Sequence, residues 1–125
     1  MTQWIKWDEM PWEEVNENIS RKMVMGDRVM MIMYRFRNRA VWPEEKHDAE
    51  QGGYIIRGRA LLRLPEDDKE LVLGPGDGYL IESNRRHSWR YLDDEVIFID
   101  FFSPPRVELL EQKFAPKAAM DSVEE

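Results

Sequence analysis

Cysteine is absent from this 125-residue chain, and histidine is rare, with two residues in all. Without cysteine the protein can form neither disulfides nor thiolate metal sites. A metal would therefore have to be held by imidazole, carboxylate or amide groups, which excludes zinc-finger sites. The length has room for one domain.

Long apolar runs are also missing. Charged residues interrupt every apolar stretch before it reaches the roughly 18 residues that a membrane-spanning helix needs. The N-terminal segment MTQWIKWDEM carries charges where a signal peptide would need an apolar region. We therefore expect a cytoplasmic protein with no membrane partner.

Positive charge is in deficit, with 18 Lys and Arg against 25 Asp and Glu and a net charge of −7. This balance argues against nucleic acid as a partner, because phosphates attract basic surfaces. Net charge describes the whole chain and not one pocket. A local basic pair such as Arg85 and Arg86 could still face a small anionic molecule.

The spacing of turns predicts an all-β sandwich or barrel, because turn signals recur about every eight to twelve residues between short apolar runs. The apolar string VMMIMYRF, residues 29–36, predicts a strand buried on both faces. Residues 54–64 predict a hairpin hinged at Gly58. Two prolines after Ser103 end the sheet, since proline cannot donate to a β-ladder. Further strands are expected at residues 19–25, 71–73, 79–81, 87–92 and 96–102.

Three segments are expected along the chain: an N-terminal arm (1–18), a barrel (19–106), and a C-terminal segment (107–125) with a short helix over 107–114 and an acidic tail. The arm contains Trp4, Trp7 and Trp12. Such residues would cover an edge strand or pack on a second subunit. We expect a homodimer.

Candidate metal ligands surround both histidines. Glu45, His47 and Gln51 share odd parity, so on a strand their side chains would project from one face. His87 would join them from a distant strand, since a metal needs several donors converging within about 2.0–2.3 Å. Each histidine taken alone also fits an ordinary surface or core position.

The spacing of these residues resembles the two motifs of the cupin superfamily. The first motif has a His-x-His pair, a Glu or Gln four residues on and a Gly seven later, and here the string is EKHDAEQGGYIIRG, from Glu45 to Gly58. The second motif runs from a Gly to a His eleven residues on, here GDGYLIESNRRH, from Gly76 to His87. The resemblance covers roughly residues 20–106 and implies an all-β cupin barrel, a double-stranded β-helix or jelly roll. The metal ligands that it implies are Glu45, His47, Gln51 and His87.

The chain departs from the cupin pattern at Glu45, which stands in place of the first histidine. A carboxylate makes the donor set harder, which shifts preference toward Fe(II), Mn(II) or Ni(II) and away from Cu(II). Zn(II) is a further candidate for the divalent metal ion. The alternative is that Glu45 does not bind and the site is weakened or empty.

The last predicted strand leads into a second candidate site, the string DFFSPPR from Asp100 to Arg106. Asp100 shares parity with Phe98 and Phe102, so an acid lies between two rings on one face. Burial would raise its pKa and suit it to general acid or base catalysis near neutral pH. Arg106 could hold a substrate carboxylate. The structural alternative is a bond from Asp100 to Arg106 or to a loop amide that closes the barrel mouth.

The same string, with GPGDGYLIESNRRHSW, also resembles the pectin-degradation (KdgF-like) branch of small cupins. In that branch the Asp, Phe and Arg matched by Asp100, Phe102 and Arg106 are associated with opening the ring of 4,5-unsaturated uronic acids. The resemblance implies a metal-dependent lyase or isomerase of sugar metabolism that acts on a small anionic substrate. Trp89 and Tyr91 share the parity of His87, so we expect them beside the substrate with Phe102 and Arg106.

Other small cupins share the FSP-x-R ending, including aromatic polyketide cyclases and isomerases of prephenate-derived acids. An aromatic polyketide cyclase, an Fe(II) dioxygenase and a non-catalytic cupin that binds a small ligand are therefore alternatives.

Overall fold

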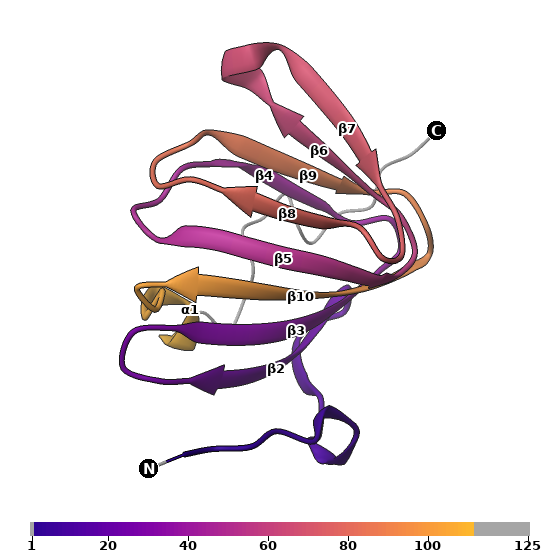
Figure 1. The fold of residues 1–125 in the computed structure, drawn as a ribbon. Helices are drawn as coiled ribbons and strands as arrows, with labels where there is room; N and C mark the ends of the chain where they lie inside the picture. Colours follow the sequence, from indigo (N-terminus) through magenta and orange to yellow (C-terminus); the bar gives the residue numbers. More distant parts are fainter. Residues whose placement is uncertain (1, 112–125) are drawn as a thin grey trace.

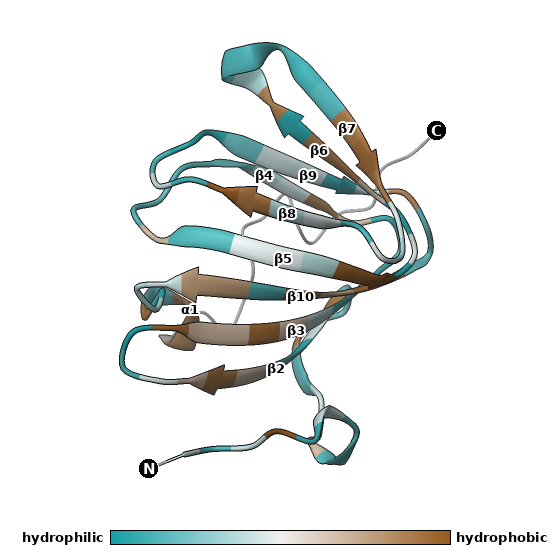
Figure 2. Ribbon diagram, in the orientation of Figure 1, coloured by the Kyte–Doolittle hydropathy of each residue, from teal (hydrophilic) through white to brown (hydrophobic). Residues whose placement is uncertain are grey.

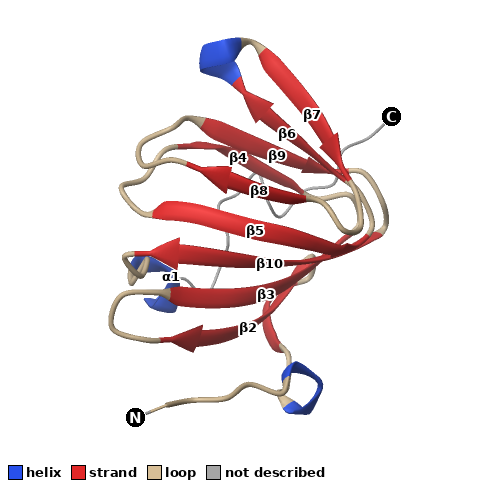
Figure 3. Cartoon of the chain, viewed as in Figure 1, coloured by secondary structure: helices blue, strands red, loops and turns tan. Residues whose placement is uncertain are grey.

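Two antiparallel β-sheets face each other and enclose the interior of the protein (Figure 1). The computed structural model describes residues 2–111. Strands make up most of this part of the chain, and helix is confined to short segments (Figure 3). The predicted all-β jelly-roll barrel with a short C-terminal helix is confirmed.

The larger sheet has six strands in the order β1-β2-β3-β10-β5-β8, and the smaller has four in the order β4-β9-β6-β7. The strands of the larger sheet are β1 (Glu13–Asn16), β2 (Ile19–Met25), β3 (Met30–Arg37), β10 (Glu95–Ser103), β5 (Glu50–Arg57) and β8 (Gly78–Ile81). Those of the smaller sheet are β4 (Val41–Glu45), β9 (His87–Tyr91), β6 (Ala60–Leu64) and β7 (Lys69–Leu73).

The helical segments are η1 (Trp7–Glu9), η2 (Pro65–Asp67) and α1 (Glu108–Glu111). Within residues 2–111, no helix has the length and apolar character needed to cross a membrane. The C-terminal part of the predicted helix and the acidic tail lie outside the described residues. As predicted, β10 ends at Ser103, directly before the two prolines.

One face of β3 is buried and the other is only partly covered. Met30, Ile32, Tyr34 and Phe36 are buried, and the residues between them are half-buried. The prediction that residues 29–36 are buried on both faces is therefore wrong. Only the inner face of the six-stranded sheet lies against the second sheet, so side chains alternate between core and surface.

In the tryptophan-rich N-terminal segment, Trp12 lies over side chains of β2 and β3. Residues 13–16 of this segment form β1 and pair with β2, so the sheet extends into the segment expected to be an arm. The ring of Trp12 lies 4.5 Å from Nζ of Lys22 and 4.6 Å from Cζ of Arg35. These cation–π contacts hold Trp12 over the sheet, whereas Trp4 is 81% exposed.

Gly58 forms a corner between the two sheets. The strands on either side of it, β5 and β6, belong to different sheets, so the predicted hairpin over residues 54–64 is wrong. Gly58 has a φ of +79°, and a Cβ at this position would lie 2.6 Å from the carbonyl oxygen of Glu95. Glycine alone combines this backbone conformation with so close an approach.

The interior changes character along β10. Toward its start, the ring of Phe36 lies 4.4 Å from that of Tyr91 and 5.3 Å from that of Phe98, centroid to centroid. Further along, the buried Asp100 interrupts the apolar strand, and Figure 2 shows a hydrophilic segment within β10. The aromatic cluster therefore closes one part of the barrel and leaves polar groups in another.

The corner at Gly58 yields a stability prediction. Gly58→Ala should lower the free energy of unfolding by about 2–4 kcal/mol, because it combines a left-handed φ with a steric clash. Gly74→Ala is the control, because a Cβ there meets only Cγ of Arg59 at 3.9 Å, and it should change stability by less than about 0.5 kcal/mol. Urea unfolding measures both, and equal stabilities would contradict the argument.

Candidate metal centre

Three of the predicted ligands lie where the chain passes from the smaller sheet to the larger. Glu45 is the last residue of β4, His47 lies in the following loop, and Gln51 is the second residue of β5. They are therefore not neighbours on one strand, as their parity suggested. His87 is the first residue of β9 and pairs with Glu45 in the β4–β9 ladder.

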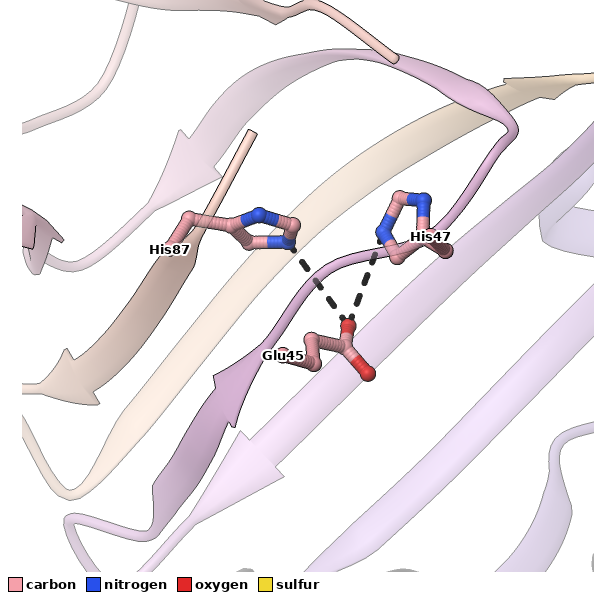
Figure 4. A group of neighbouring side chains, drawn as sticks. All are labelled: Glu45, His47 and His87. Carbon is pink, nitrogen blue, oxygen red and sulfur yellow. Dashed lines mark ion pairs between the residues drawn. The ribbon is translucent and has the colours of Figure 1, made fainter. Parts of the chain in front are cut away.

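The side chains of Glu45, His47 and His87 converge on a common point (Figure 4). Nε2 of each histidine lies 3.7 Å from Oε1 of Glu45, and the three donor atoms all lie within 4.8 Å of one another. Nitrogen and oxygen ligands bind zinc at about 2.0–2.2 Å, which separates donors around one such ion by about 3–4.5 Å. The spacing therefore suits a single divalent ion.

Backbone carbonyls orient both imidazole rings. Nδ1 of His47 lies 2.8 Å from the carbonyl oxygen of Ala49, and Nδ1 of His87 lies 2.8 Å from that of Arg85. A carbonyl oxygen only accepts, so in the neutral rings Nδ1 carries the proton and donates it. Each Nε2 then presents a lone pair, which is the arrangement found in metal-binding histidines.

Three buried acceptors have no hydrogen-bond partner among the described residues: Nε2 of His47, Nε2 of His87 and Oε1 of Gln51. Buried polar atoms in native proteins nearly always have a hydrogen-bond partner, so these three acceptors require a donor or a cation. A divalent cation would satisfy all three together with the Glu45 carboxylate. The donors are nitrogen and oxygen atoms, so the residues fit the metals expected from the sequence.

Asn84, in the loop that precedes His87, is joined to the loop that holds His47. Its backbone N–H donates to the carbonyl oxygen of His47 at 2.8 Å. Asn84 has a φ of 63°, in the left-handed region. Asparagine tolerates this conformation better than most residues.

Arg106 lies against the candidate ligand Glu45. Its Nη1 and Nη2 donate to the two carboxylate oxygens of Glu45 at 3.3 and 3.4 Å, and its Nε donates to Glu108 at 3.0 Å. Burial opposes ionisation of Glu45, but His87, Arg106 and His47 outweigh burial and lower the pKa of its carboxyl group. Glu45 is therefore held as a carboxylate, the form that binds metal.

Asp100 is buried, 5% exposed, and accepts a hydrogen bond from the hydroxyl of Tyr79. Burial raises the pKa of Asp100 to about 7, against the opposing effect of hydrogen bonds from Tyr79 and Gln51. The predicted alternative of an Asp100–Arg106 bond is not the arrangement seen, since Arg106 pairs with Glu45. Sequence reasoning missed Tyr79, although its parity with Ile81 in the second motif was a signal.

A narrow pocket lies beside these groups. About 20 Å³ of it is open to the centre of a water molecule. Each residue expected to act on substrate lines it, together with two candidate ligands and other aromatic side chains. The lining comprises Tyr34, Phe36, Trp42, Glu45, Gln51, Trp89, Tyr91, Phe98, Asp100, Phe102 and Arg106.

Comparison with known proteins assigns the family. A family model described as a cupin domain matches residues 33–102. The chain belongs to the cupin family. This cupin is 32% identical over 105 residues to the pectin degradation protein KdgF of Dickeya dadantii (strain 3937), covering 82% of the chain and 94% of that protein.

Solved structures give the same family. KdgF from Halomonas sp. has a TM-score of 0.79 and 25% identity, covering 87% of this chain and 99% of that one. The polyketide cyclase RemF from Streptomyces resistomycificus has a TM-score of 0.70, with 84% and 81% covered, but its 16% identity shows a common fold alone. The expected resemblance to the pectin-degradation branch is confirmed.

Loss of one candidate ligand should weaken metal binding. In Glu45→Ala we expect the affinity for Mn(II), Ni(II) or Zn(II) to fall by about 100-fold or more, because the change removes a donor that Arg106 orients. The adjacent Glu44 is exposed, so Glu44→Ala is the matched control and should bind as tightly as the unaltered protein. Calorimetric titration of metal-free protein measures both affinities. Equal affinities in the two variants would remove Glu45 from the ligand set.

The raised pKa of Asp100 predicts a pH-dependent stability. The unfolded chain releases this proton near pH 3.8, whereas the folded protein keeps it to about pH 7. The stability that protonated Asp100 contributes is fully present below pH 3.8 and is lost as the pH rises to about 7. The free energy of unfolding falls by up to about 4 kcal/mol over this range. Asp100→Asn removes this titration. In urea unfolding of metal-free protein, the stability of Asp100→Asn relative to the unaltered protein should therefore increase as the pH rises from 4 to 8. Parallel pH curves would contradict a raised pKa.

Proposed function

We propose that this cupin is a metal-dependent isomerase that opens the ring of a small cyclic unsaturated carboxylate such as a 4,5-unsaturated uronate. The observation that carries the proposal is the placement of Asp100, whose carboxyl pKa is raised to about 7, in the same pocket as candidate metal ligands. The similarity to KdgF, named as a pectin degradation protein, supports the substrate class.

The proposed reaction moves one proton and neither gains nor loses atoms. The hydroxyl on C1 loses its proton, the bond from C1 to the ring oxygen breaks, and C1 becomes an aldehyde. The ring oxygen leaves as an enolate on C5, which becomes a ketone when C4 gains a proton. With a pKa near neutrality, Asp100 can take one proton and give another at working pH. A divalent metal, when bound, would supply Lewis-acid polarisation of a substrate oxygen.

Arg106 and Phe102 form the proposed site for the substrate carboxylate. The guanidinium has five N–H groups, and three of them donate to Glu45 and Glu108. The other two N–H groups have no acceptor within residues 2–111 and are left for a carboxylate. The Phe102 ring lies 5.1 Å from Cζ of Arg106 and 5.7 Å from the ring of His47, so it separates the arginine from bulk water on that side.

The polar lining of the pocket favours a small acid over a polyketide. A polyketide cyclase needs a large apolar cavity for several fused rings, whereas this pocket is lined in part by the charged or polar side chains of Glu45, Gln51, Asp100 and Arg106. A compact substrate with a carboxylate and several hydroxyls matches these groups.

A homodimer remains part of the proposal. Tyr54, Ile56 and Leu80 lie on β5 and β8 with 49%, 43% and 73% of their surfaces exposed. Exposed apolar residues on neighbouring strands support contact with a second subunit.

Asp100→Asn should lower kcat for an unsaturated galacturonate by about 100-fold or more, because amide nitrogen and oxygen cannot exchange the proton. The assay follows loss of the ultraviolet absorbance of the conjugated double bond. Metal content, measured on the same samples, should be unchanged. Asp94→Asn at an exposed site is the matched control and should keep full activity. Full activity in metal-loaded Asp100→Asn would remove Asp100 from the mechanism, and no turnover by unaltered protein would refute the substrate class.

A further inference from the structure

Three residues form a row across neighbouring strands of the six-stranded sheet. Tyr79 on β8 is the register partner of Gly53 on β5, and Gly53 is the register partner of Asp100 on β10. Gln51 and Ile81, two residues away in the same ladder, are buried. Because side chains alternate along a strand, Tyr79 and Asp100 also face the interior, with the glycine between them.

The missing side chain of Gly53 makes room for the Tyr79 ring. A Cβ at position 53 would lie 2.1 Å from Cζ and 2.2 Å from Oη of Tyr79, which is inside van der Waals contact. The ring therefore lies across β5, directly over the glycine. Its hydroxyl passes over the intervening strand and donates to Oδ1 of Asp100.

The ring also packs against Trp89, with the ring centroids 4.7 Å apart at an interplanar angle of 58°. Trp89 is buried and lines the pocket, so it cannot yield without repacking the interior. A side chain at position 53 would therefore displace the Tyr79 hydroxyl from Asp100.

We propose that Tyr79 is the positioning residue for Asp100, and that Gly53 is required because it leaves the space in which Tyr79 reaches it. The role of Asp100 rests on the proposed function, but the contact does not. Hydrogen bonds from Tyr79 and Gln51, on two different strands, restrain rotation of the carboxylate. A proton-transferring group misplaced by about 1 Å can lose about two orders of magnitude in rate.

Adjacent glycines provide a matched pair of variants. In Gly53→Ala we expect kcat for the unsaturated galacturonate to fall by about 10–100-fold, with KM and metal content unchanged. Gly52 faces the opposite side, where a Cβ would meet Cδ1 of Leu80 at an ordinary 3.9 Å, so Gly52→Ala should stay within about twofold.

Tyr79→Phe isolates the hydroxyl without altering the packing of the ring, and its kcat should fall as in Gly53→Ala. The Gly53→Ala/Tyr79→Phe double variant should lose no more than Tyr79→Phe alone, because both changes remove the same hydrogen bond. Full kcat in Tyr79→Phe, or equal losses in Gly53→Ala and Gly52→Ala, would overturn the proposal.

A second readout needs no substrate and separates this proposal from the proposed function. With ¹³C-labelled aspartate in alkaline buffer, the infrared carboxylate band assigned to Asp100 by its absence in Asp100→Asn should shift in Tyr79→Phe and Gly53→Ala. It should not shift in Gly52→Ala. An unshifted band in Tyr79→Phe would refute the contact even if turnover is observed, whereas a shift without turnover would refute only the uronate reaction.

Discussion

One part of the barrel is organised around three buried acceptors that need a positively charged partner. Nε2 of His47, Nε2 of His87 and Oε1 of Gln51 are buried without hydrogen-bond partners among the described residues. The surrounding loops maintain this arrangement, because backbone carbonyls hold both Nδ1 atoms and Asn84 ties one loop to the other. Folding thus directs several lone pairs inward, and a bound cation would offset the cost of their desolvation.

Charge balance explains how glutamate can occupy a position usually held by histidine. Exchanging a neutral imidazole for a carboxylate adds one negative charge to a buried site, which is unfavourable without a counter-charge. Arg106 supplies that charge through both of its terminal nitrogens, and Glu108 holds the arginine from its other side. The departure from the family pattern is therefore compensated from the C-terminal end of the barrel, and the residue expected to meet substrate also neutralises a candidate ligand.

Local pattern was sufficient for the barrel and for the end of β10 at the prolines, because side chains alternate and turns have characteristic residues. The gathering of Glu45, His47 and His87 followed from the resemblance to the two cupin motifs. Local sequence pattern could not predict contacts between residues far apart in the chain. The change of sheet at Gly58, the pairing of Arg106 with Glu45 and the passage of Tyr79 over Gly53 depend on strand register. A glycine in the sequence also does not indicate which neighbouring side chain fills the space that its own side chain would take.

Burial, together with the nearby cation of Arg106, lowers the pKa of His47. Protons and metal ions compete for the same lone pair on Nε2, so a weaker base loses less of its binding capacity as the surroundings become acidic. The enclosure of His47 thereby lowers the pH at which protons would begin to compete for this ligand.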